Sequence, residues 1–386
     1  IIGIFVCSFC FNEKSFVEKY FLEFYKPTHL SNENDLSFPK EHFISNLTWF
    51  CYQKNHLCQS STLQMIAAKH GINKPLDYLS FLLGYTYSAT YIKGAGMFVP
   101  YSDPEPGFIL ASNYLGLERK YLVTDNQHIL LQNIRCYLSK GYPVRIAWNS
   151  AITMKYAVES DYFPRPKGWK EPSKQAFSPH SVLFVGYDST SFYYYETHGK
   201  DFVLKGEKGI RIDEKSAAEA ILSFSSRYGL PWKYMMTIFE KDSASASLSK
   251  IWERTGEDMI GRVLGPTSTG SFAIKELSNG VKIEGTNIFR SPKKEMFINT
   301  IQTLVEIRSD NASFLEHTFH DDNDILKAAE LLGNSSDNYK KIFAILNKDI
   351  LTKTDVNSIC GLLNSSAEAE YEAGNIFILV GKKNKT

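Results

Sequence analysis

The apolar residues in the first part of the chain follow helical spacing in some stretches and strand spacing in others. Residues 59–70 have the apolar repeat of a helix, and Gly71 stands just past its end. The same repeat returns at 127–140 and stops before Gly141. Residues 142–148, YPVRIAW, then have the pattern of a strand. Mixed spacing of this kind predicts a domain that combines helices with a sheet.

A polar, proline-bearing stretch at 159–179 separates these elements from a predicted hairpin. It is too long for a simple turn, which indicates a functional or covering loop. Apolar residues at 180–187 and 192–199 predict two strands, joined by the turn-forming residues DSTS. A helix at 214–227 and a strand at 234–240 are predicted to close this part of the chain.

Strand signals largely disappear after a short linker predicted at 241–249. A Ser cap and a Pro at the first helical position predict a helix over 291–307. Helical spacing continues at 323–333 and at 338–351, with no strand signal between them. This region is therefore predicted to be made of helices.

Together these patterns predict an α+β domain at 1–242 followed by an all-α domain at 248–386. The 386 residues are 43% apolar and 22% charged, as in ordinary soluble globular proteins. A net charge of +1 argues against a general polyanion-binding surface, so no nucleic-acid partner is expected. No apolar run is long enough to span a bilayer, and we expect a cytoplasmic protein. The apolar start, residues 1–11, is predicted to be a buried first strand, with the tail of a signal peptide as the alternative.

Six cysteines are scattered through the chain, and such spacing argues against a disulfide framework. Cys7 and Cys10 form a CxxC pair, but no second pair completes a zinc site, so we expect two thiols in a buried strand. Neither a metal nor an organic cofactor is predicted. The six are Cys7, Cys10, Cys51, Cys58, Cys136 and Cys360.

One of these cysteines, Cys58, stands directly before the helix predicted at 59–70. A helix N-terminus favours a thiolate through its dipole and its free N–H groups, and a nearby histidine can take the thiol proton. The backbone N–H of Cys58 would also point at a developing oxyanion. A lone cysteine is more often a small buried hydrophobic residue. The hypothesis of a nucleophile therefore needs a base elsewhere in the chain.

His180 is the candidate base, because it begins the first strand of the predicted hairpin. If positions that sum to 378 face each other, His198 lies opposite His180, and Glu196 is diagonal to it on the same face. A carboxylate orients an imidazole and stabilises its cation, which makes Glu196 the candidate partner. Gln53 is the candidate for a second oxyanion donor, and His56 is close to the thiol in sequence. Each residue has an ordinary structural explanation, but the combination is far less common than its parts.

Two stretches, CQSSTLQMIAAKHG and HSVLFVGYDSTSFYYYETHG, resemble papain-like cysteine enzymes of the bacteriocin-leader-peptidase type. The closer resemblance is to the N-terminal domain of butirosin biosynthesis protein H. Shared motifs are His-x-Cys at the helix start, here His56-Leu57-Cys58, and a G-x-P-V strand, here Gly141-Tyr142-Pro143-Val144. The same His strand before a hairpin is also shared. The helical tail, with FAIKELSNG and DILKAAELLGNSSDNYKKIFAILN, resembles the domain that often follows in that family.

This resemblance implies a papain-like fold, with a helix packed on an antiparallel sheet, and acyl transfer through a thioester on Cys58. The namesake of the family moves an aminoacyl group from a carrier-protein thioester to an amine. The implied partners are therefore an acyl-thioester donor, such as an acyl carrier protein, and an amine acceptor. Two positions differ from the related peptidases. Glu196 stands where most have Asp followed by Pro, and Gln53 lies one residue closer to the cysteine.

Arg165 and Lys167 belong to the basic part of the 159–179 loop. Such a loop is usually solvated surface, and its functional interpretation is a docking edge for an acidic carrier protein or its phosphopantetheine arm. Together with His56 and His198, these two residues are the candidate substrate-binding residues. Three hypotheses stay open: acyl transfer in small-molecule biosynthesis, hydrolysis of a peptide or amide by the same catalytic residues, and a catalytically inactive binding protein.

A second cluster of titratable residues, HTFHDDND, lies at 317–324. It has the residue types of a divalent metal site. The preferred interpretation is that its aspartates stand at the N-terminus of a helix that ends at Gly333, where the helix dipole favours negative charge.

Overall fold

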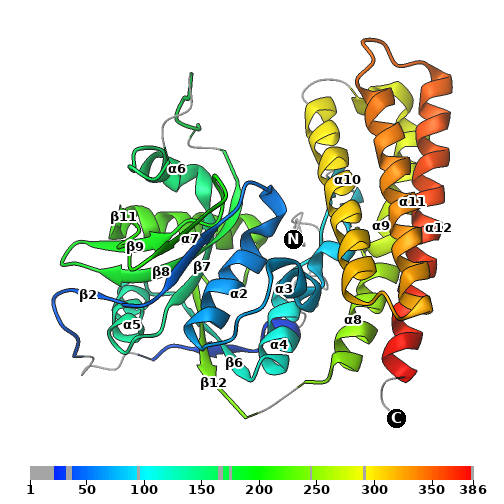
Figure 1. The fold of residues 1–386 in the computed structure, drawn as a ribbon. Helices are drawn as coiled ribbons and strands as arrows, with labels where there is room; N and C mark the ends of the chain where they lie inside the picture. The colour runs from blue at the N-terminus through cyan, green and yellow to red at the C-terminus, as the bar shows by residue number, and fades with distance from the viewer. Residues whose placement is uncertain are drawn as a thin grey trace. The chain divides into compact units, whose positions relative to one another are not determined.

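The computed structural model describes residues 21–31, 37–93, 96–163, 168–173, 176–243, 246–289 and 293–383 (Figure 1). These residues form two compact units, and each unit is built from two separate stretches of the chain. The sheet unit comprises residues 21–76 and 115–243, and the helical unit comprises residues 77–114 and 246–383. Residues 77–114 thus pack with the C-terminal helices, although they lie inside the range predicted as the first domain.

The sheet unit is organised around a mostly antiparallel sheet. The strand order is β1-β6-β12-β7-β8-β9-β11, with β2 paired to β8 beside this path, and only β1 and β6 run parallel. A separate antiparallel pair joins β3 and β10. The strands are β1 (Pro27–His29), β2 (His42–Phe43), β3 (Thr48–Cys51), β6 (Leu117–Thr124), β7 (Val144–Asn149), β8 (Pro179–Tyr187), β9 (Ser191–Tyr195), β10 (Phe202–Lys205), β11 (Ile210–Asp213) and β12 (Tyr234–Lys241).

The predicted hairpin is present as β8 and β9. Leu183 pairs with Tyr195, which is the register that the sequence predicted, and a bulge between Phe184 and Gly186 shifts the pairing beyond it. The second strand is shorter than predicted, since β9 ends at Tyr195. The chain then turns toward β3 and forms an isolated parallel bridge between His198 and Tyr52. This turn brings Glu196 back to the start of β8.

The sheet unit contains the helices α2 (Cys58–Lys69), α5 (Gln127–Ser139), α6 (Ser150–Val158) and α7 (Glu214–Tyr228), and residues 21–25 are also helical. Figure 1 shows α2 in front of the sheet and α7 behind it. The helices predicted at 59–70, 127–140 and 214–227 are confirmed to within two residues. Asn126 caps α5 and Asp213 caps α7, so the signals that start these two helices are local. Helix α6 was not predicted.

The helical unit contains α3 (Leu76–Leu83), α4 (Glu105–Tyr114), α8 (Leu248–Ile260), α9 (Gly270–Glu284), α10 (Lys293–Thr318), α11 (Asn323–Leu346) and α12 (Lys353–Lys383). Helices α10, α11 and α12 run side by side (Figure 1). The prediction of a helical C-terminal region is confirmed. The all-α description of it is wrong, because β13 (Val263–Leu264) and β14 (Thr267–Thr269) pair with β4 (Thr90–Ile92) and β5 (Met97–Val99) in a small sheet.

The break predicted after Gly333 is also absent, and α11 continues through it to Leu346. Just beyond Gly333, Ser335 and Ser336 are buried against neighbouring helices. Ser335 donates a hydrogen bond to Glu370 (2.7 Å), and Ser336 donates one to the carbonyl of Val305 (3.0 Å). Their hydroxyls are satisfied by tertiary contacts, so the helix need not end.

None of the helices in the part of the chain that the structure describes is both long and apolar enough to cross a membrane. The predicted first strand at 1–11, with Cys7 and Cys10, lies outside the described residues.

Candidate functional site

Cys58 is the first residue of α2, as the sequence predicted. A short 3₁₀ helix, η1 (Asn55–Leu57), leads into it from β3. Among the described residues, no side chain caps the start of α2 at Leu57. Cys58 is partly exposed and its thiol is free. A negative charge on its sulfur would therefore stand at a helix N-terminus that carries no side-chain acceptor.

The first turns of α2 carry polar side chains that are nevertheless buried, and hydrogen bonds satisfy two of their hydroxyl groups. Ser61 donates to the carbonyl of Phe50 (2.8 Å), which ties α2 to β3. Thr62 donates to the carbonyl of Cys58 (2.7 Å), four residues earlier in the same helix. These bonds fix the beginning of the helix, and with it the position of Cys58.

His180 is the second residue of β8, and its ring joins Cys58 to Glu196. The ring interacts with both the Cys58 thiol and the Glu196 carboxylate. Its hydrogen bond to the carboxylate runs from Nε2 to Oε1. Only 11% of the His180 side chain is exposed. The structure therefore brings together the three residues that the sequence singled out as candidate nucleophile, base and acid.

Glu196 is held in place by several donors besides the histidine. Its Oε1 accepts the backbone N–H groups of Thr197 (2.8 Å) and His198 (3.0 Å). Its carbonyl oxygen accepts the indole N–H of Trp49 (2.7 Å). A buried carboxylate with this many donors is stabilised in its ionised form.

The electrostatics of the pair follow from burial and mutual attraction. Burial alone would lower the pKa of His180, but the Glu196 charge and the interactions with the Glu196 and Cys58 side chains raise this pKa to about 10. Burial alone would raise the pKa of Glu196, and the His180 charge with the two backbone N–H donors lowers it. An imidazolium paired with a carboxylate is thus the favoured state at neutral pH.

Aromatic side chains cover the backbone beside Glu196. The rings of Trp49 and Tyr195 are stacked with centroids 4.8 Å apart, and Tyr162, Phe163 and Phe202 surround Trp49. Tyr162 and Phe163 come from the predicted covering loop at 159–179. This aromatic cluster limits the access of water to the buried carboxylate.

The remaining predicted site residues differ in how far they are exposed. Gln53 is exposed, and its backbone N–H donates to Asp201 (2.8 Å). His56 is buried in η1, with 3% of its surface exposed. His198 was predicted to lie opposite His180, but β9 ends before it, and His198 is exposed on the turn after Glu196, where it bridges to Tyr52. Arg165 and Lys167 lie outside the described residues.

The sequence did not single out four residues that contact the candidate catalytic residues or their neighbours: Arg145, Thr62, Thr197 and Trp49. The spacing of the sequence could have indicated Thr62, because it stands four residues after Cys58 on the same face of the predicted helix. Thr197 lies next to Glu196, and its hydroxyl is 3.3 Å from His180 Nε2. Arg145 and Trp49 come from other strands, so no local spacing could indicate them.

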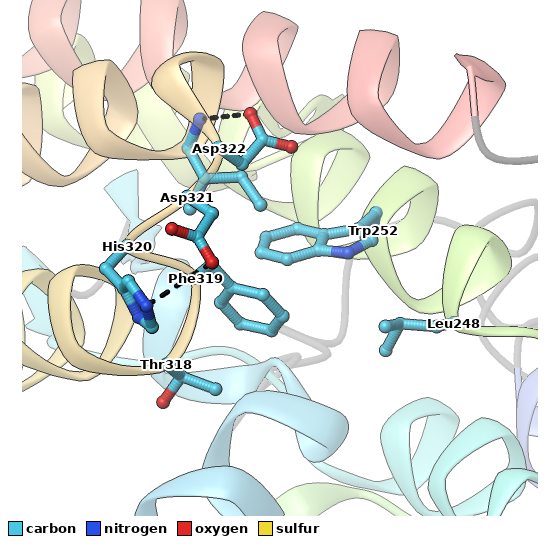
Figure 2. Close-up of a pocket in the computed structure, with 8 residues that line it drawn as sticks. Leu248, Trp252, Thr318, Phe319, His320, Asp321 and Asp322 are labelled. Carbon is cyan, nitrogen blue, oxygen red and sulfur yellow. Dashed lines mark hydrogen bonds and ion pairs between the residues drawn. The ribbon is translucent and has the colours of Figure 1, made fainter.

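A separate pocket of about 340 Å³ opens in the helical unit. Figure 2 shows the rings of Trp252 and Phe319 facing it and His320 and Asp321 beside them. Trp252 is only 1% exposed, because its ring already packs against neighbouring aromatic rings, so it offers no free face to a ligand. Asp322 caps α11 through the N–H groups of the next turn, which confirms the helix-start interpretation of this cluster. In the described residues no three His, Cys, Asp or Glu side chains converge as metal ligands.

Neither the models of known protein families nor the curated proteins gave a match to this sequence.

Proposed function

We propose that this chain is a papain-like cysteine acyltransferase that carries an acyl group as a thioester on Cys58. The proposal rests above all on one observation, the continuous path of side-chain interactions from Cys58 through His180 to Glu196. That path activates a thiol and orients the histidine that must hold and return a proton.

In the first step, the Cys58 thiolate attacks the carbonyl carbon of a thioester donor. A new C–S bond forms to Cys58, the bond to the donor sulfur breaks, and the protonated His180 returns a proton to the departing thiolate. The N–H groups at the start of α2 are placed to stabilise the oxyanion of the tetrahedral intermediate. Glu196 keeps the imidazole oriented while its charge changes.

In the second step, an amine attacks the acyl-Cys58 thioester. His180 takes the proton from the amine nitrogen, an amide bond forms, and Cys58 leaves as a thiolate paired with the imidazolium. Water in place of the amine would give hydrolysis by the same route. The low exposure of His180 and the aromatic cluster near Glu196 favour transfer, because they restrict water at the site.

The choice of a thioester donor rests on the resemblance to butirosin biosynthesis protein H. An acyl carrier protein is the corresponding donor partner, and small-molecule biosynthesis in the cytoplasm is the corresponding context. In this proposal the basic loop residues Arg165 and Lys167 form the docking edge for the carrier.

The test is the intact mass of the protein after mixing with acyl-thioester donors. We expect an adduct of one acyl group that Cys58→Ser abolishes, and that added amines discharge faster than water does. Cleavage of peptides without any thioester adduct would replace transfer with the peptidase hypothesis. An unmodified protein with no turnover of either substrate would indicate an inactive binding protein.

A further inference from the structure

Arg145 is a fully buried arginine in the middle of the sheet unit, and the proposed chemistry does not use it. It lies on β7, and 1% of its surface is exposed. Its guanidinium donates to Gln59 Oε1 (2.8 Å), Ser181 Oγ (3.2 Å) and Thr237 Oγ1 (3.4 Å). A buried guanidinium is costly to desolvate, so its hydrogen bonds must be well placed.

Two of these acceptors are direct neighbours of the reacting pair. Gln59 follows Cys58 on α2, and Ser181 follows His180 on β8. Arg145 therefore bridges the helix that carries the nucleophile and the strand that carries the base. Because the planar guanidinium has donors in a rigid fork, it sets the two acceptors at a fixed separation.

The direction of the hydrogen bonds extends this bridge to Cys58 itself. Arg145 can only donate, so Ser181 Oγ accepts from it and keeps its own proton for another acceptor. That acceptor is Thr62 Oγ1, which lies 3.2 Å away. Thr62 in turn uses its proton for the Cys58 carbonyl. A single chain of donors thus leads from Arg145 through Ser181 and Thr62 to the backbone of Cys58.

We propose that Arg145 is a positioning residue for the Cys58–His180 pair: by binding Gln59 and Ser181 together, it fixes the start of α2 against the start of β8. This inference rests on the proposed function, since it concerns how the same pair is aligned. The three hydrogen bonds named above lead to Gln59, Ser181 and Thr237, so Arg145 acts through residues next to the reacting pair.

The experiment measures how strongly Cys58 depends on His180, with and without Arg145. Iodoacetamide alkylation of Cys58 is followed by peptide mass spectrometry. In each background, the alkylation rate of the protein with His180 is divided by the rate of the same protein with His180→Ala. We expect a ratio of roughly tenfold or more in the wild-type background, and a ratio near one in Arg145→Met, because small misalignments cost large factors. Arg145→Lys should give an intermediate ratio, since an ammonium keeps the charge without the fork.

Thr237→Val is the matched control, because it removes the longest bond of Arg145 and leaves Gln59 and Ser181 bound. Its ratio should equal that of the wild type. If Arg145→Met does not fold, Gln59→Leu and Ser181→Ala each remove one side of the bridge, and both should lower the ratio.

Arg145 would be only structural if Arg145→Met lowered Tm but kept the wild-type ratio. The same holds if Gln59→Leu and Ser181→Ala both lowered Tm and kept that ratio. That result overturns the inference and leaves the proposed function standing. A wild-type ratio of one is a different result, since it would overturn the proposed function and this inference together.

Discussion

At the scale of single residues, Cys58 differs from the other described cysteines in its surroundings. Cys51, Cys136 and Cys360 are buried, whereas Cys58 is partly exposed beside His180. Burial raises the pKa of Cys51 and also that of Cys360, so both thiols resist ionisation.

We therefore expect iodoacetamide at neutral pH to alkylate Cys58 at least about tenfold faster than those three cysteines. His180→Ala should remove most of this advantage, because the imidazolium that stabilises the Cys58 thiolate is lost. Peptide mass spectrometry of a time course gives each rate. Equal labelling of all four cysteines would contradict the nucleophile hypothesis.

The His180–Glu196 pair predicts a pH dependence of stability. The pKa of His180 is raised to about 10. Its contribution to the free energy of unfolding is therefore complete below the unfolded pKa of about 6.5, and it is lost as pH rises toward 10. The pKa of Glu196 is lowered, so its contribution disappears as pH falls below about 4.3. The pair should therefore stabilise the protein most between about pH 4.5 and 6.5.

Glu196→Gln should lower stability by about 3 kcal/mol in that pH window, since it leaves the buried imidazolium unpaired. The measurement is the Tm of wild type and variant from pH 4 to pH 10. Their difference should shrink toward pH 10. Glu219→Gln, on the exposed surface of α7, is the control and should show no such trend. A Tm difference that is constant with pH would rule out the charged pair.

At the scale of elements, two glycines of α12 have opposite environments. A Cβ on Gly374 would lie 2.9 Å from the Gly256 carbonyl oxygen and 2.9 Å from Ile260 Cγ1, both on α8. A Cβ on Gly361 would meet nothing within 4 Å. Close packing of α8 against α12 therefore requires glycine at 374 and not at 361.

Gly374→Ala should destabilise the helical unit by about 1–3 kcal/mol, because the helices must move apart. Gly361→Ala should stabilise it by about 0.5–1 kcal/mol, because alanine is the better helix former. Urea denaturation followed by circular dichroism measures both. If both substitutions change the free energy of unfolding in the same direction, the close packing of α8 against α12 at Gly374 is contradicted.

At the scale of the whole molecule, the two units are interleaved along the chain. The helical unit needs residues 77–114, since the carbonyl of Thr86 accepts from Arg308 (2.6 Å) and Asn311 (3.1 Å). Tyr91 and Phe98 also belong to its apolar core. The two stretches meet where the Ala246 N–H donates to the Asn113 carbonyl (3.2 Å).

A fragment of residues 246–386 should therefore show no cooperative thermal transition, because Arg308 loses the Thr86 carbonyl and the apolar core loses Tyr91 and Phe98. Residues 77–114 joined to 246–386 by a short Gly/Ser linker should melt cooperatively, since residues 113 and 246 are hydrogen-bonded neighbours. Differential scanning calorimetry compares the two. A cooperative transition in the shorter fragment would show that 77–114 is dispensable.

The sequence by itself determined the elements whose signals are local. Apolar spacing predicts α2, which begins at Cys58, and it predicts α5, which the Asn126 cap also favours; both signals act within a few positions. The register of Leu183 with Tyr195 was also predictable, since a short turn limits how the two strands can pair. These local signals were enough to predict that His180 and Glu196 would be neighbours.

Only the tertiary structure decided the features that depend on distant residues. The Arg308 guanidinium binds the Thr86 carbonyl across 222 positions, and Arg145 binds Gln59 across 86. The continuity of α11 through Ser335 depends on Glu370, 35 positions away. No periodicity encodes such contacts, because a buried polar side chain is satisfied by whichever group the fold brings to it, and that group is known only once the chain is packed.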